Sequence, residues 1–190
     1  VIHRLQGMGV LDFPQTILGH CIHLDKSEKE TLEHSKAWVA ANIESNLNNN
    51  VGLADHKQCT DCVILGTDGM HSDMLRSAKA AFFVGQLKGD LGALEVYTWF
   101  RNIHRYLKEN EFEGDGENNL VILNYDSPTV INQDNFLGHF IYGIESNHVE
   151  SVIANGRLIV KDGILQTMDE SSILEAAREA GTRLWHKLSK

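Results

Sequence analysis

Three short apolar segments, each followed by a helical pattern, constrain the fold of this chain more than any other feature. The segments are residues 16–22, 37–41 and 63–66, and their β-branched or small apolar residues are typical of buried strands. Strands that alternate with helices pair in parallel, because each connection crosses over the sheet. The sequence therefore predicts an α/β fold for its first part, residues 1–119.

The segments between these strands contain recognisable helix signals. Asp25 and Glu28 have the spacing of a capping box for a helix that ends near Lys36, and Ser72 or Asp73 caps a later helix. Apolar periodicity also predicts that residues 1–11 end a helix and that residues 95–108 form one. The asparagine-rich stretch 42–50 is expected to be a loop.

The second part, residues 120–190, has a different pattern. Residues 120–123, 149–154, 157–161 and 164–167 are predicted strands. Asn155-Gly156 and Asp162-Gly163 are the dipeptides preferred in two-residue hairpins, so the strands should form an antiparallel meander. Thr167 and Glu170 have the spacing to cap a final amphipathic helix.

The composition limits which binding partners and which cellular compartment we expect for this chain. The 190 residues include 17 Lys and Arg against 26 Asp and Glu, a net charge of −9. Nucleic acids and anionic membrane surfaces require basic patches, so neither is an expected partner. The longest apolar run is too short to cross a membrane. Three cysteines are an odd number, which indicates no disulfide framework and a reducing, cytoplasmic setting.

Polar side chains follow each predicted strand of the first part. His20 lies at the end of the first strand, Asn46 beyond the second and Asp68 just past the third. In α/β folds, functional sites form at the carboxyl ends of parallel strands. An imidazole and a carboxylate suit a divalent metal and its bound water. The alternative is structural: a buried histidine bonded to backbone and an aspartate that caps the next helix.

Three other candidates have weaker support. His71 lies in the same loop as Asp68 and is a candidate to face the same site as Asp68. Ser45 lacks the glycines of a nucleophile elbow, so a nucleophilic serine is not expected. Cys59 and Cys62 have metal or redox spacing without a second pair, which favours strand residues at the edge of a core.

Three motifs, in this order, resemble the last three strands of a metal-dependent amidohydrolase barrel. They are Gly19 to Asp25, Asn42 to Asn46 and Leu65 to Gly69. The closest branch contains cytosine and guanine deaminases and atrazine chlorohydrolase. Within it, residues 72–74, 135–139 and 152–157 resemble the SsnA group of aminohydrolases.

This resemblance implies a fold and an activity. The fold is the last three strands of a (β/α)₈ TIM barrel over residues 1–119, then a portion of a small β-sandwich and a terminal helix over residues 120–190. The activity is metal-dependent hydrolysis of carbon–nitrogen bonds other than peptide bonds, of the aminohydrolase (deaminase) or chlorohydrolase type. The expected substrate is a small nitrogen-containing heterocycle.

The resemblance also implies roles for individual residues. Asp68 is expected to bind a divalent metal, zinc or alternatively iron, and to take part in catalysis. His20 is the second catalytic residue, and Asn46 and His71 are expected to contact the substrate.

The family's first-strand His-x-His and fifth-strand histidine have no counterpart in this sequence. The chain begins at Val1 in a helix without a capping residue, so we expect it to be part of a longer protein. An N-terminal partner segment or a second copy would then complete the barrel. The alternative is a non-catalytic, truncated homologue or interaction fragment that binds no metal.

Overall fold

The chain divides into two compact units. The computed structural model describes residues 1–55, 60–89, 91–112 and 118–189. Unit 1 comprises Val1–Asp115 and Tyr125–Ser146, and unit 2 comprises Gly116–Asn124 and Asn147–Lys190. The sequence places residues 125–146 in the second domain, whereas the structure packs them with the first.

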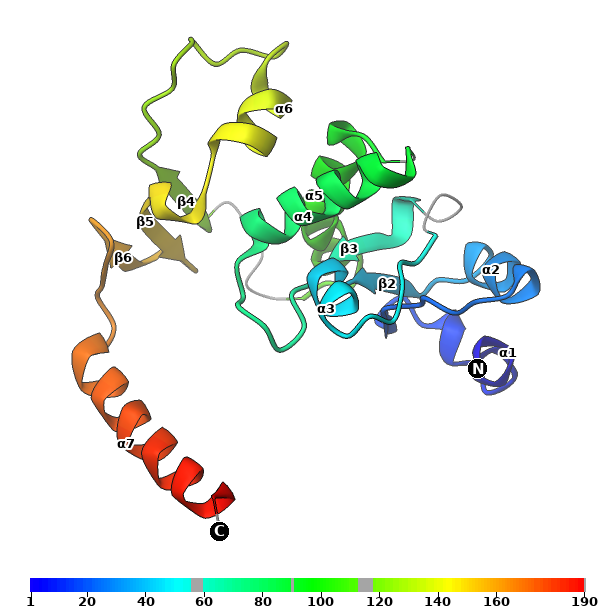
Figure 1. The fold of residues 1–190 in the computed structure, drawn as a ribbon. Coiled ribbons are helices and arrows are strands. Elements are labelled where there is room, and N and C mark those ends of the chain that lie inside the picture. The colour runs from blue at the N-terminus through cyan, green and yellow to red at the C-terminus, as the bar shows by residue number, and fades with distance from the viewer. Residues whose placement is uncertain (56–59, 90, 113–117, 190) are drawn as a thin grey trace. The chain divides into compact units, whose positions relative to one another are not determined.

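Unit 1 is built on a parallel sheet of three strands. These are β1 (Ile17–Gly19), β2 (Trp38–Ala41) and β3 (Val63–Leu65), in that spatial order. Figure 1 labels β2 and β3. Gly19 lies opposite Ala40, and Ala41 lies opposite Leu65. The expected parallel arrangement is therefore confirmed, and all three strands end at the same edge.

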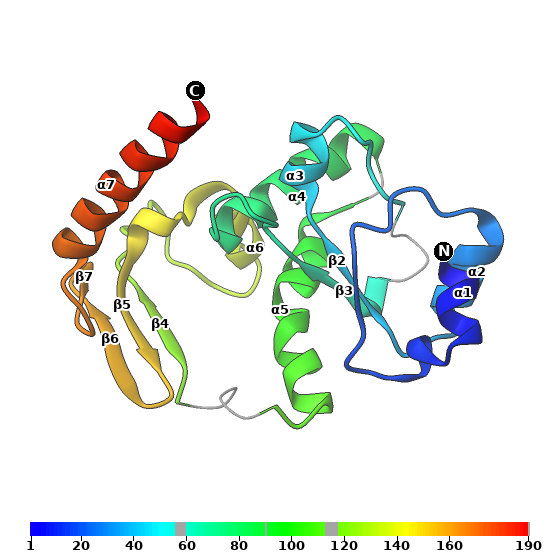
Figure 2. The ribbon, with the colours of Figure 1, turned by 90° about the horizontal axis from the view of Figure 1, so that it is seen from below.

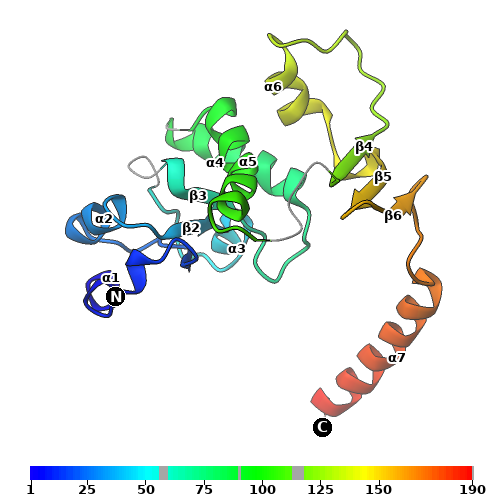
Figure 3. The ribbon, with the colours of Figure 1, turned by 180° about the vertical axis from the view of Figure 1, so that it is seen from behind.

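The two faces of this sheet contact different apolar clusters. Val39 and Val63 point into the main core, and Trp38 and Ile64 point into a smaller cluster with Tyr106. Successive strand residues face opposite sides, which separates these two sets. The helices of unit 1 are α1 (Ile2–Gly7), α2 (Lys26–Glu33), α3 (Ile43–Asn48), α4 (Met74–Lys88) and α5 (Ala93–Glu109). In Figures 1 and 3, α4 and α5 lie side by side next to β3.

One expected loop is a helix. Residues 42–50 were expected to be a loop because asparagine favours turns, but α3 occupies most of this stretch. Ile43, Ser45 and Asn46 of α3 are buried, with at most 7% of their surface exposed. The loop prediction is therefore wrong. The preference of asparagine for turns is a weak constraint, and burial of α3 in the folded protein overrides it.

Other element ends also shift. The first strand ends at Gly19 and not at residue 22, because His20 and Cys21 have positive φ angles of 67° and 47°. The capping box of Asp25 and Glu28 is confirmed, but α2 ends at Glu33 and not near Lys36. Asp73 caps α4 by accepting a hydrogen bond from the backbone of Arg76.

The segment 125–146 adds short helical turns to unit 1. It contains α6 (Phe136–Gly138) and η3 (His139–Gly143). Phe140 and Ile141 belong to the main core, and Ile141 has no exposed surface. The remaining short turns of the chain are η1 (Val10–Asp12), η2 (Thr60–Cys62) and η4 (Ser146–His148).

The cysteines depart from expectation. Cys21 is a free thiol, whereas Cys62 is disulfide-bonded. A single disulfide is not the framework that the odd count argues against. The side chain of Cys62 packs at the edge of the smaller cluster, but the residue belongs to η2 and not to a strand. Cys59 lies outside the described residues, so its predicted place at the edge of a core stays a prediction.

Unit 2 is an antiparallel meander followed by one helix. Its strands are β4 (Leu120–Leu123), β5 (Val149–Ala154), β6 (Arg157–Lys161) and β7 (Ile164–Leu165), in that order (Figure 2). Both hairpin dipeptides, Asn155-Gly156 and Asp162-Gly163, have positive φ at each residue, as a type I′ turn requires. The predicted meander is confirmed.

The last helix, α7 (Glu170–Leu188), is capped by Asp169 and not by Thr167, so that prediction is wrong. Asp169 accepts hydrogen bonds from the backbone of Ser171 and Ser172. None of the residues of α7 is buried. Across the described residues, no helix combines the length and apolar character needed to cross a membrane.

The packing of segment 125–146 into unit 1 can be tested by truncating Ile141. We expect Ile141→Ala to lower the free energy of unfolding of unit 1 by about 2–5 kcal/mol, because it removes a fully buried side chain. Urea unfolding would be followed by the fluorescence of Trp38 and Trp99 in a Trp185→Phe background. Ile173→Ala on exposed α7 is the control and should change stability by less than about 0.5 kcal/mol. Equal effects of the two variants would contradict the assignment.

Candidate functional site

A histidine and an aspartate from two strand ends form the centre of the candidate site. His20 directly follows β1, and Asp68 lies three residues beyond β3. Nε2 of His20 lies 3.4 Å from Oδ2 of Asp68, and the two side chains are 40% and 41% exposed. The structure thus brings the pair together in a position that solvent can reach.

Local backbone conformation turns both side chains to this position. His20 and Asp68 have φ angles of 67° and 53°, in the left-handed region. Aspartate and histidine enter this region more readily than most other residues. At the neighbouring Gly66, a Cβ atom would collide with Oδ1 of Asn42, so glycine is required where β3 passes the start of α3.

Two consecutive residues of α3 contact His20 and Asp68 from the interior of the protein. Oδ1 of Asn46 lies 2.7 Å from Nδ1 of His20. The hydroxyl of Ser45 donates a 2.7 Å hydrogen bond to Oδ2 of Asp68. Ser45 is 4% exposed and Asn46 is 1% exposed, so both act on the pair from the protein interior. The expected contact of Asn46 with a substrate stays a prediction.

Hydrogen bonds have the largest effect on the pKa of Asp68. The hydroxyl of Ser45 contributes most to lowering the pKa of this carboxyl, followed by the backbone N–H of Gly69, which lies 2.7 Å from Oδ1. Partial burial opposes this effect, and the charge of His20 adds a smaller decrease. Asp68 is therefore held as a carboxylate, the form that binds a cation.

His71 has two partners within the chain, and its expected contact with a substrate stays a prediction. Its Nε2 lies 2.6 Å from Oε2 of Glu44, and its Nδ1 accepts a hydrogen bond from the backbone of Asp73 at 3.0 Å. Because Nδ1 accepts, Nε2 carries the proton and donates to Glu44. Glu44 also accepts from Nε of Arg76. The structure therefore engages both ring nitrogens of His71 in a network that joins α3 to the start of α4.

The described residues do not complete a metal site. Within residues 1–55, 60–89, 91–112 and 118–189, no three His, Cys, Asp or Glu side chains are arranged to hold a metal ion. Catalytic metals usually have three protein ligands. The carboxylate of Asp68 suits a divalent cation as one ligand, with His20 beside it, but the other ligands would have to come from elsewhere.

Sequence reasoning missed Ser45 and Glu44. Ser45 was considered only as a nucleophile, although its place next to Asn46, beyond a strand end, was a usable signal. Glu44 had no such signal, because its partners His71 and Arg76 are 27 and 32 residues away. These contacts depend on how α3 packs against α4.

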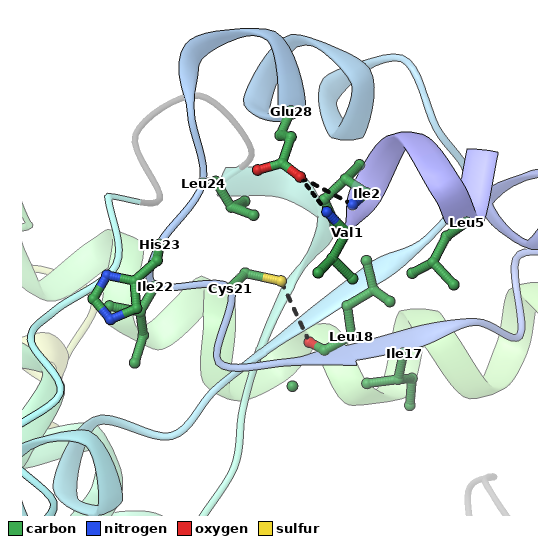
Figure 4. A pocket seen from close by; sticks show the side chains of 11 residues that line it. Val1, Ile2, Leu5, Ile17, Leu18, Cys21, Ile22, His23, Leu24 and Glu28 are labelled. Atoms are coloured by element: carbon green, nitrogen blue, oxygen red, sulfur yellow. Dashed lines mark hydrogen bonds and ion pairs between the residues drawn. The ribbon is translucent and has the colours of Figure 1, made fainter. Parts of the chain in front are cut away.

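A cavity lies on another side of the turn that follows β1. It has a volume of about 340 Å³ and is lined by residues of α1, β1, α2 and the turn (Figure 4). Its lining includes Cys21, whose pKa is raised to about 11, mainly by burial and also by Glu28. A thiol with so high a pKa is not a nucleophile at neutral pH. His20 and Asp68 do not line this cavity.

Comparisons with known proteins identify relatives of the chain. No protein-family model matches it. A 5-methylthioadenosine/S-adenosylhomocysteine deaminase from Syntrophomonas wolfei is 26% identical over 199 residues, which cover 96% of this chain and 46% of the relative. A 5′-deoxyadenosine deaminase from Methanococcus vannielii is 27% identical, covering 93% of this chain and 45% of the relative. The chain thus spans slightly under half the length of these curated relatives.

Solved structures agree on the fold. An adenosine deaminase from Xanthomonas campestris with bound zinc matches with a TM-score of 0.80 and 20% identity, over 97% of this chain and 45% of that one. A mutant atrazine chlorohydrolase from Arthrobacter aurescens, complexed with zinc and atraton, matches with a TM-score of 0.70 and 17% identity, over 93% of this chain and 43% of that one. The expected similarity to deaminases and to atrazine chlorohydrolase is confirmed, in sequence for the deaminases and in fold for the chlorohydrolase. The finer placement in the SsnA group stays a prediction.

The effect of Ser45 on Asp68 can be tested by titration. We expect Ser45→Ala to raise the pKa of Asp68, because it removes the largest cause of the decrease. A lowered folded-state pKa stabilises the fold above the unfolded-state pKa, and this contribution is lost as pH falls through the folded-state pKa. In Ser45→Ala this contribution should therefore be smaller above the unfolded-state pKa, and its loss should be complete at a higher pH. The measurement is the Asp68 carboxyl ¹³C chemical shift against pH.

Ser77→Ala is the matched control for this titration. Ser77 is also a buried serine, but its hydroxyl faces Glu44 and not Asp68. Its replacement should leave the pKa of Asp68 unchanged. If the Ser45→Ala titration coincides with the parent curve, the hydroxyl does not control this carboxyl.

Proposed function

We propose that this chain is part of a metal-dependent hydrolase that acts on carbon–nitrogen bonds other than peptide bonds. It would supply the last three strands of a (β/α)₈ barrel and part of a small β-sandwich. The observation that carries the proposal is the pair of His20 and Asp68, which are 48 positions apart in sequence and 3.4 Å apart in space. The two side chains converge at the carboxyl ends of parallel strands, and α/β-barrel enzymes build their active sites at that end of the strands.

We propose separate roles for Asp68 and His20 in the reaction. Asp68 is the one described residue proposed as a metal ligand, and it also takes up or releases a proton. A bound divalent metal, zinc in the solved neighbours, would lower the pKa of a water molecule to about 7. His20, open to solvent beside Asp68, would hold the reacting group or move its proton.

The substrate class follows from the relatives. The curated relatives are deaminases of adenosine derivatives, and an atrazine chlorohydrolase shares the fold. We propose a small nitrogen-containing heterocycle as the substrate, with release of an amino group as the first reaction to test. The net charge of −9 agrees with a small-molecule partner and not with nucleic acid. We also propose a cytoplasmic location, which cell fractionation tests.

A second polypeptide segment is part of the proposal. Three strands cannot close a barrel, and every residue of β4 is apolar and at least 37% exposed. Apolar surface of this kind is commonly covered by a partner. We propose an N-terminal segment equivalent to the remainder of the relatives as that partner. His71 would line the substrate site only after such a segment rearranges its contact with Glu44.

The alternative is a non-catalytic homologue. It is favoured by the incomplete ligand set among the described residues. Such a chain would bind another protein or a second copy of itself and carry out no metal chemistry.

Complementation separates the two functions. The chain would be co-expressed with the part of the Syntrophomonas wolfei relative that it does not match, which is about half of that protein. Zinc content and ammonia release from 5′-deoxyadenosine and 5-methylthioadenosine would then be measured. We expect zinc and ammonia release from the complex and from neither part alone. A complex that contains no zinc and releases no ammonia from a range of heterocycles would favour the non-catalytic homologue.

Variants of the complemented protein test the assigned roles. Asp68→Asn keeps a residue that tolerates positive φ, and we expect it to lower kcat by at least about 10²-fold and to reduce zinc content. His20→Asn should lower kcat by a similar factor and leave zinc content nearly unchanged. Full turnover in Asp68→Asn, at matched protein levels, would refute the ligand role. A parallel loss of zinc in His20→Asn would make His20 a ligand as well.

A further inference from the structure

Three consecutive side chains of α3 reach three different partners. Glu44 contacts His71 and Arg76, Ser45 contacts Asp68, and Asn46 contacts His20. Successive residues of an α-helix point about 100° apart, so one turn of helix is enough to hold all three. The contact of Glu44 ties α3 to the loop that carries Asp68, and the other two contacts act on the pair itself.

The contact of Asn46 is the most directional of the three. Its side chain is 1% exposed and its Oδ1 lies 2.7 Å from Nδ1 of His20. An amide oxygen only accepts hydrogen bonds, so the ring nitrogen that faces it must carry the proton. A neutral imidazole has one protonated nitrogen, and Nε2 is then the nitrogen with a free lone pair.

The free lone pair points toward Asp68. Nε2 of His20 lies 3.4 Å from Oδ2 of Asp68, and this oxygen also accepts the hydrogen bond of Ser45. Two acceptors therefore face each other at the exposed side of the pair. Two acceptors at this distance repel each other unless a proton or a cation lies between them, so the space between Nε2 and Oδ2 is a position for a proton from a reacting group.

We propose that Asn46 is a positioning residue that selects the tautomer of His20 with the proton on Nδ1. The purpose of this selection rests on the proposed function, because it leaves Nε2 as the proton-accepting atom beside Asp68. The tautomer itself is a property of the 190-residue chain and is measured without turnover. Asn46 thus acts through His20.

The opposite arrangement has a defined consequence. Nδ2 of Asn46 is buried and has no hydrogen-bond partner among the described residues. If the amide were turned so that Nδ2 faced the ring, Nδ1 would accept and Nε2 would donate to Asp68. That arrangement predicts the other tautomer, so one measurement decides between the two.

The test is the ¹⁵N spectrum of the imidazole ring of His20. The metal-free chain would be studied at alkaline pH, where the ring is neutral, and His20 would be assigned from a His20→Asn spectrum. We expect Nδ1 to resonate as a protonated nitrogen and Nε2 as an unprotonated one. Observation of Nε2 as the protonated nitrogen in the parent chain would overturn the proposal.

Three variants show whether Asn46 is the cause. Asn46→Ala should make the Nδ1–H tautomer a minor species, because the acceptor is lost. Asn46→Asp keeps an acceptor of the same shape and should retain the tautomer, which also covers the case that Asn46→Ala fails to fold. Asn110→Ala, at a second asparagine whose amide oxygen is buried without a described partner, is the control and should leave the His20 signals unchanged.

The outcomes distinguish this proposal from the proposed function. An unchanged tautomer in folded Asn46→Ala, or loss of the tautomer in Asn46→Asp, would overturn the role of Asn46 whatever the complemented protein catalyses. A confirmed tautomer together with an inactive complemented protein would support the positioning role and count against the hydrolase.

Discussion

Parallel pairing of three short strands is the constraint on which the candidate site depends. In the register of this sheet, Gly19 lies opposite Ala40, and Ala41 lies opposite Leu65. The chain therefore leaves the sheet three times at the same edge. Residues that follow these positions meet there although more than forty positions separate the first from the last. A different register would move His20 and Asp68 apart.

Helix α3 converts this proximity into a defined geometry. It begins directly after β2 and buries two polar side chains, Ser45 and Asn46. Buried polar groups are costly unless they are hydrogen-bonded, so their bonds to Asp68 and His20 help to stabilise both the helix and the pair. The left-handed turns at His20 and Asp68 complete the arrangement by directing both side chains toward each other. The stability of this region and the geometry of the site therefore depend on the same contacts.

Several features of the described residues fit the proposed second segment. The sheet of unit 1 has three strands, and the carboxylate of Asp68 has no second and third metal ligand within the described ranges. In unit 2, β4 and α7 leave apolar side chains exposed. The relatives are about twice as long as this chain. An added segment that covers the exposed surface and supplies the missing ligands would account for all of these observations together.

The sequence by itself determined the order of the strands, their parallel and antiparallel pairing, both hairpins and the convergence of His20 and Asp68. These features follow from local patterns and from the rule that parallel strands end at one edge. Only the tertiary structure decided that residues 42–50 contain a helix, that residues 125–146 join unit 1, and that His71 faces Glu44. These outcomes depend on burial and on partners distant in sequence, which override the local preferences that a pattern of residues reports. The support of His20 by Asn46 belongs to the same class, because it exists only once α3 is packed.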